Sequence, residues 1–109
     1  MSELKFMMAV WKIWEETMGE IECTNCPIGL PNFNVTHVAH VLTKGAHPEY
    51  KYVLEGVMPL CFDCHRQYDQ GDFSVMPMMS HVYRVIDLLS FKPFHRWDGK
   101  KFIHDRRNI

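Results

Sequence analysis

Four cysteines stand in two Cys-x-x-Cys pairs, Cys23 with Cys26 and Cys61 with Cys64, and the 109-residue sequence contains no other cysteine. The short turn inside each pair lets two thiolates reach one ion at about 2.3 Å, and two pairs supply the four ligands of a tetrahedral zinc. Two disulfides would need an oxidising compartment, and a redox Cys-x-x-Cys normally occurs singly. The spacing therefore predicts one structural zinc ion held by all four cysteines.

Histidines accompany the two cysteine pairs. The segment between the pairs, residues 27–60, is longer than the roughly 15–20 residues of a plain four-cysteine zinc module, and it contains His37, His40 and His47. His65 directly follows the last cysteine. A neutral imidazole can accept a proton near pH 7 or bind a metal. The plainer alternatives are a hydrogen-bonded strand histidine at His40, and a helix-start residue or a competing zinc ligand at His65.

The elements that must position these residues follow from hydrophobic spacing, beginning with a helix over residues 1–19. Ser2 is a suitable cap for its start, and Gly19 a suitable stop. Apolar residues recur along it at three- and four-residue spacing, at Leu4, Met7, Met8, Trp11 and Trp14. Such a face is normally buried in the core of the same chain. The alternative is a homodimer formed through this helix.

The middle of the chain predicts two short strands, residues 35–42 and 57–60, joined by a long loop with one helical turn at Pro48. Strand alternation puts His40 on one face of the first strand and His37 on the opposite face. The second strand leads directly into the second cysteine pair. The cysteine pairs would therefore clamp both ends of a hairpin that carries histidines.

The last part of the chain predicts two helices and a basic tail. One helix begins at residue 64 and is cut short by Gly71, and a second falls within residues 74–91. Residues 92–109 carry six Lys or Arg against two Asp, a balance that suits a phosphate-binding surface but equally a solvated end. Phe94 and Trp97 in this tail are expected to pack against the body, because large aromatic side chains favour burial.

Length and composition limit the class of protein to which this chain can belong. A chain of 109 residues with 47% hydrophobic content forms one small α+β domain, whose core a bound zinc would help to stabilise. The net charge of −1 favours no particular partner. Residues 1–18 contain Glu3, Lys5 and Lys12 within their apolar run, which fits neither an export signal nor a membrane span. We therefore expect a cytoplasmic protein with no membrane segment.

Three segments together resemble the HNH, or ββα-metal, nuclease family. They are ECTNC, THVAHVLTKGAHPEYKY and EGVMPLCFDCHRQYD. The likeness is to the zinc-hooked branch of phage and bacterial proteins, which includes phage Holliday-junction endonucleases, and it covers residues 22–71. It implies a ββα core clamped by zinc, within a bacterial or phage-infected cell.

The resemblance also implies roles for individual residues. His40 falls where the family has the general base that activates the attacking water. His65 falls on a ligand of a catalytic divalent ion, and Asp69, one helical turn later, replaces a second ligand with a carboxylate that also suits Mg²⁺ or Mn²⁺. The family's acidic residue or histidine before the base is Ala39 here, so His37 is a further candidate ligand. The family's loop-pinning asparagine falls on Gly56.

The basic residues near these segments predict a nucleic-acid surface, with DNA as the expected partner. Phosphate contacts are expected from Lys44, Arg66, Arg96, Lys100, Lys101, Arg106 and Arg107. The main hypothesis is a metal-dependent DNA endonuclease. The alternatives are a zinc-containing nucleic-acid-binding protein that has lost the chemistry, and a protein-interaction module built on Trp11 and Trp14.

Overall fold

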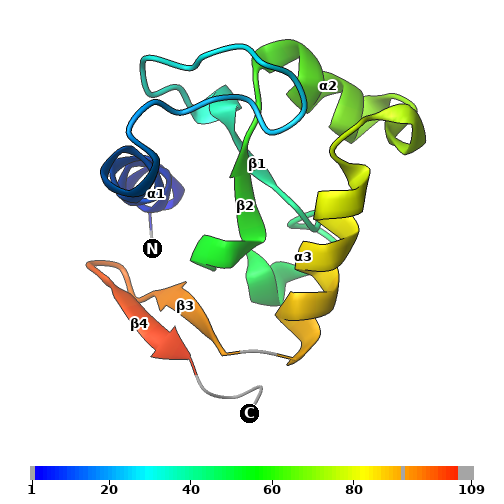
Figure 1. Ribbon diagram of the computed structural model, residues 1–109. Helices are drawn as coiled ribbons and strands as arrows, with labels where there is room; N and C mark the ends of the chain where they lie inside the picture. Colours follow the sequence, from blue (N-terminus) through cyan, green and yellow to red (C-terminus); the bar gives the residue numbers. More distant parts are fainter. Residues whose placement is uncertain (1, 92, 106–109) are drawn as a thin grey trace.

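Three α-helices and two small antiparallel sheets form the regular structure of residues 2–91 and 93–105, the part of the chain that the computed structural model describes (Figure 1). The Cα radius of gyration is 13.4 Å, close to the roughly 13 Å expected for one compact domain of this length. The predicted α+β class is confirmed. None of the helices in these residues has the length and apolar character that a bilayer crossing requires.

The first helix, α1 (Glu3–Met18), has the predicted caps. The Ser2 hydroxyl accepts a hydrogen bond from the Lys5 N–H, and Gly19 ends the helix at a φ of 73°, a left-handed value that favours glycine. The predicted apolar stripe was wrong in part, because Leu4 and Met8 are half exposed. The face that packs on the core consists of Phe6, Met7, Val10, Trp11 and Trp14.

Two short strands, β1 (Val38–His40) and β2 (Val57–Pro59), pair antiparallel with His40 opposite Val57. The first strand is shorter than predicted because a 3₁₀ turn, η1 (Val35–His37), precedes it. The Asn34 side chain stabilises this turn by accepting hydrogen bonds from the N–H and hydroxyl of Thr36. His37 therefore lies in a turn and stacks on Trp11, with ring centroids 6.2 Å apart.

The connection between the strands and the helix that follows them are close to the prediction. The loop contains 3₁₀ turns η2 (Pro48–Tyr50), as expected at Pro48, and η3 (Leu54–Gly56). Helix α2 (Phe62–Gln70) starts two residues earlier than predicted. The Tyr68 hydroxyl donates a hydrogen bond to the Val41 carbonyl and so ties this helix to the end of β1.

The last helix, α3 (Met79–Phe91), falls within the predicted residues 74–91 and follows the 3₁₀ turn η4 (Phe73–Val75) and Pro77. Two further strands, β3 (Phe94–Trp97) and β4 (Phe102–Asp105), then form a hairpin. In Figure 1 this hairpin lies at the opposite end of the molecule from α2.

The predicted basic tail was therefore wrong over residues 94–105, which fold onto the body as a hairpin. Phe94 and Trp97 are buried as expected, and the backbone N–H of Trp97 donates to the Tyr52 carbonyl at 2.8 Å. Two of the predicted phosphate contacts, Arg106 and Arg107, lie outside the described residues.

Candidate functional site

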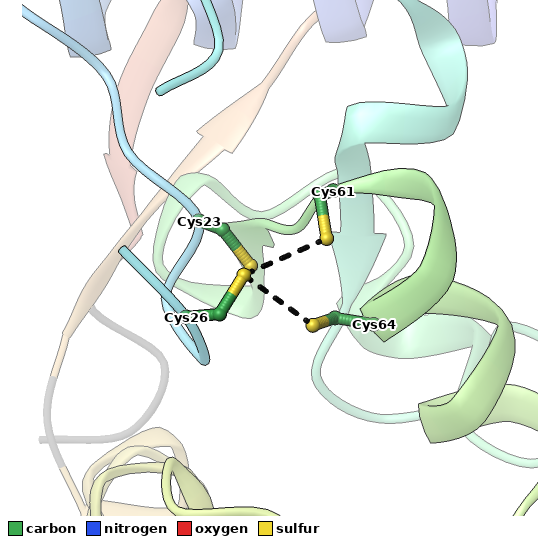
Figure 2. Close-up of side chains that lie close together, drawn as sticks. All are labelled: Cys23, Cys26, Cys61 and Cys64. Carbon is green, nitrogen blue, oxygen red and sulfur yellow. Dashed lines mark hydrogen bonds between the residues drawn. The ribbon is translucent and has the colours of Figure 1, made fainter. Parts of the chain in front are cut away.

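The four cysteine sulfurs converge on one point (Figure 2). Cys23 and Cys26 approach from the loop after α1, and Cys61 and Cys64 from the start of α2. All four sulfurs lie within 4.8 Å of one another, and Cys26 Sγ lies 3.8 Å from the sulfurs of both Cys61 and Cys64. A tetrahedron with metal–sulfur bonds of about 2.3 Å has edges of about 3.8 Å, whereas a disulfide bond is about 2.05 Å long. The cysteines are thus positioned to hold a metal ion, as predicted for structural zinc.

Residues inside the first cysteine pair fix it against the rest of the domain. The backbone N–H and the hydroxyl of Thr24 both donate to the Pro59 carbonyl at 2.8 Å, which ties this pair to the end of β2. The Asn25 amide donates to Cys64 Sγ at 3.3 Å and accepts from the Met78 N–H at 3.3 Å. Hydrogen bonds of this kind around ligating atoms hold a metal site in shape.

The electrostatics of the cluster call for a cation. Burial raises the pKa of the Cys64 thiol to about 12, so without a metal this sulfur keeps its proton at neutral pH. Burial also opposes the charge of a Cys23 thiolate, but N–H groups of Cys61, Asn25 and Cys26 outweigh it and lower the pKa of Cys23. A divalent ion would replace the proton of the Cys64 thiol and neutralise the charge of a Cys23 thiolate.

A cavity of about 620 Å³ is lined by several of the predicted site residues. His40 reaches it from β1, and His65 and Asp69 from α2. Its wall also includes Lys44, and Glu3 from the first turn of α1. The predicted base and the two predicted ligands of the catalytic ion therefore face one space. His37 does not line it, because its ring packs on Trp11.

His40 is held in one tautomer. Its Nε2 lies 2.8 Å from the Lys51 carbonyl oxygen, which can only accept a hydrogen bond, so Nε2 carries the proton and Nδ1 keeps a free lone pair when the ring is neutral. Burial lowers the pKa of His40, and the Lys51 hydrogen bond only partly offsets this effect. The ring also packs on Phe6. The imidazole is thus neutral, oriented and able to accept a proton at neutral pH.

His65 and Asp69 form a pair on one face of α2. The Thr36 carbonyl accepts a hydrogen bond from His65 Nδ1 at 2.5 Å. The neutral ring therefore has a lone pair on Nε2, which lies 3.2 Å from Asp69 Oδ2. Two electron-pair donors at this distance repel each other unless a proton or a cation lies between them. Imidazole and carboxylate are both ligands of divalent metals.

The predicted phosphate-binding residues are dispersed. Lys44 lies at the cavity, whereas Arg66 is exposed on α2 and packs over the Phe62 ring. Arg96 is committed to the hairpin, because it pairs with Asp105 at 2.8 Å and donates to the Glu49 carbonyl. The remaining two, Lys100 and Lys101, are exposed at the turn between β3 and β4.

Three residues that the sequence did not single out act on the two histidines or on the cavity that the histidines line. Thr36 and Lys51 orient the two histidines through backbone carbonyls, and Glu3 places a carboxylate beside the base. A backbone carbonyl gives no residue-type signal in a sequence. Residue spacing along the strands also gives no sign that the first turn of α1 lies at the cavity.

Comparison of the chain with protein-family models, curated proteins and solved structures gave no significant match. The fold and the cysteine cluster define a small α+β protein with a centre suited to a metal ion. Two antiparallel strands followed by a helix occur in the order that the resemblance implied. Any statement of function therefore depends on the geometry of the cavity.

Proposed function

We propose that this chain is a metal-dependent endonuclease of the HNH type, which hydrolyses phosphodiester bonds in DNA. One observation carries the proposal: an oriented neutral histidine, His40, lines the same cavity as the paired donors of His65 and Asp69. A base for water and a site for a cation that neutralises phosphate charge are the two parts that such hydrolysis needs.

In the proposed reaction, His40 accepts a proton from a water molecule in the cavity. The oxygen of that water bonds to phosphorus as the bond from phosphorus to the leaving oxygen breaks. The leaving oxygen takes a proton from solvent, and the products are one phosphomonoester end and one hydroxyl end. The Lys51 carbonyl assists by holding Nε2–H, which keeps Nδ1 available and stabilises the imidazolium that forms.

The donors of His65 and Asp69 suit a single divalent ion. Mg²⁺ or Mn²⁺ bound there would neutralise charge that develops on the phosphate. An imidazole ligand favours Mn²⁺ or Ni²⁺ over Mg²⁺. Thr36 supports this assignment, because its carbonyl holds the proton on Nδ1 and leaves Nε2 free as a ligand.

DNA is the proposed substrate, with phosphate contacts from Lys44 at the cavity and from the exposed Arg66, Lys100 and Lys101. These contacts would position the backbone without reading sequence. We place the protein in the cytoplasm, where thiols stay reduced and remain free to bind zinc.

A second candidate is a zinc-containing nucleic-acid-binding protein without catalysis. Ala39 favours it, because this fully buried methyl side chain stands where the family has an acidic residue or histidine. The interaction module built on Trp11 and Trp14 has less support, since both indoles are buried in the core of the chain. A homodimer through α1 stays a prediction, and it would have to use exposed side chains such as Leu4 and Met8.

The test is a cleavage assay with zinc-loaded protein. Plasmid, single-stranded and branched DNA are incubated with Mg²⁺, Mn²⁺ or Ni²⁺ in turn, using wild type and His40→Ala. His81→Ala is the matched control, because His81 is exposed on α3 and does not line the cavity. We expect metal-dependent cutting that falls about 10²–10⁴-fold in His40→Ala alone. Equal cutting by wild type and His40→Ala would refute the assignment, and binding without cutting would favour the second candidate.

A further inference from the structure

Two lysine ammonium groups hold the carboxylate of Glu3 at the cavity. Lys44 Nζ lies 2.6 Å from Glu3 Oε1, and Lys51 Nζ lies 4.0 Å from Glu3 Oε2. Each lysine thus faces a different oxygen of the same anion. The hydrogen bond from Lys44 is the main cause of a lowered Glu3 pKa, so Glu3 is ionised at neutral pH. The lysines therefore form an anion site that is filled by the chain itself.

This anion site lies next to the proposed base. Lys51 contributes to the anion site and to the orientation of the base, because its backbone carbonyl fixes the His40 ring while its side-chain ammonium faces Glu3. The negative charge of Glu3 also acts on His40, which places the two groups within electrostatic range. An anion between the lysines is therefore an anion close to the base.

The Glu3 carboxylate is a replaceable occupant. The side chains of Lys44, Lys51 and Glu3 are 44%, 37% and 31% exposed, and partly exposed ion pairs of this kind contribute little to stability. A phosphodiester also carries one negative charge over two terminal oxygens, so it can satisfy both lysines as the carboxylate does. Exchange of one anion for the other keeps the number of ion pairs unchanged.

We propose that Lys44 and Lys51 form a phosphodiester-binding site whose resting occupant is Glu3, and that a nucleic-acid phosphate binds by displacing this carboxylate. Nucleic acid as the ligand rests on the proposed function. The exchange would bring a phosphate to His40 and move Glu3, with the first turn of α1, away from the lysines. Glu3 therefore competes with substrate, and Lys51 is a binding residue as well as a positioning residue.

The test measures binding rather than cleavage. A fluorescein-labelled single-stranded oligonucleotide is titrated with zinc-loaded protein at low salt, without added divalent ion, and anisotropy gives Kd. We expect Glu3→Gln to lower Kd by up to about fivefold, because the competing charge is lost. Glu16→Gln removes the same charge from an exposed position on the same helix, and we expect it to change Kd by less than about twofold.

A double-mutant cycle separates displacement from general charge effects. In a Lys44→Met/Lys51→Met background, binding should be weaker and Glu3→Gln should give no further gain. An equal effect of Glu3→Gln and Glu16→Gln, or a gain that persists without the lysines, would overturn the inference. Thermal melts and zinc content verify that each variant is folded. Because no cleavage is required, a failed nuclease assay would leave this result intact, and active enzyme with no Glu3 effect would reject the anion site alone.

Discussion

Removal of the zinc ion should unfold the domain. Three of the cysteines that would bind it, Cys23, Cys61 and Cys64, belong to the main hydrophobic core, so a zinc ion there would join the loop after α1 to the start of α2 from within. Structural zinc sites contribute about 10–16 kcal/mol of binding free energy at pH 7, while a whole small domain has a net stability of about 5–15 kcal/mol. The loss therefore matches or exceeds the stability available, and we expect no folded metal-free protein.

The assay follows zinc and structure together. Wild type is dialysed against a strong chelator, zinc is counted by elemental analysis, and folding is followed by circular dichroism. The control is the same chelator saturated with zinc, and a Cys64→Ser variant removes one ligand without any reagent. A native spectrum and an unchanged melt at zero zinc, or disulfides between these cysteines, would refute the reasoning. Zinc should also be lost more easily as pH falls, because the pKa of about 12 for the Cys64 thiol makes the ion compete with a proton.

Three further results are expected. The acid limb of the cleavage rate should have its midpoint below about pH 6.5, the ordinary value for histidine, because burial lowers the pKa of the His40 base and protonation inactivates it. A midpoint above that value in kcat/KM would contradict this. His65→Ala and Asp69→Asn should each raise the divalent-ion concentration for half-maximal cleavage by at least about tenfold, with zinc content unchanged. An unchanged metal titration would show that neither residue is a ligand. Replacing Lys100 and Lys101 with Met should lower duplex affinity and reduce the slope of log Kd against log salt by about 0.9 for each lost phosphate contact. An unchanged slope would show that these two lysines are solvated and do not contact phosphate.

The helical and metal-binding features could be predicted because they depend on local spacing. The caps at Ser2 and Gly19 are set by short-range geometry. The convergence of the two cysteine pairs could be expected because their spacing is the one that a tetrahedral zinc site needs. The orientation of α1 was harder. Leu4 and Met8 fit the same period as Trp11, but only tertiary packing decides that Phe6 and Val10 take the buried positions instead.

The hairpin at the carboxyl end shows why charge composition misled the prediction. The excess of Lys and Arg indicated a basic tail that binds phosphate or is solvated, yet Arg96 pairs with Asp105 across the hairpin and donates to the Glu49 carbonyl on a distant turn. Phe94 and Trp97 supply the apolar area that holds these residues on the body. Partners nine and more residues apart are not visible in a count of charges. Truncation before residue 94 would therefore remove part of the core, and the Lys100 and Lys101 substitutions test phosphate binding without this damage.

The metal centre and the cavity share one element, and this links folding to the proposed chemistry. Cys64 and His65 are neighbours at the start of α2, so a metal bond that anchors Cys64 would also hold His65 in place. Thr36 then fixes the His65 ring from η1, which lies directly before the strand that carries His40. A structural ion at one end of α2 can thus set the positions of both histidines without contacting either. For this reason a lost zinc ligand should remove activity even where folding is rescued by low temperature, whereas loss of His40 should remove activity alone.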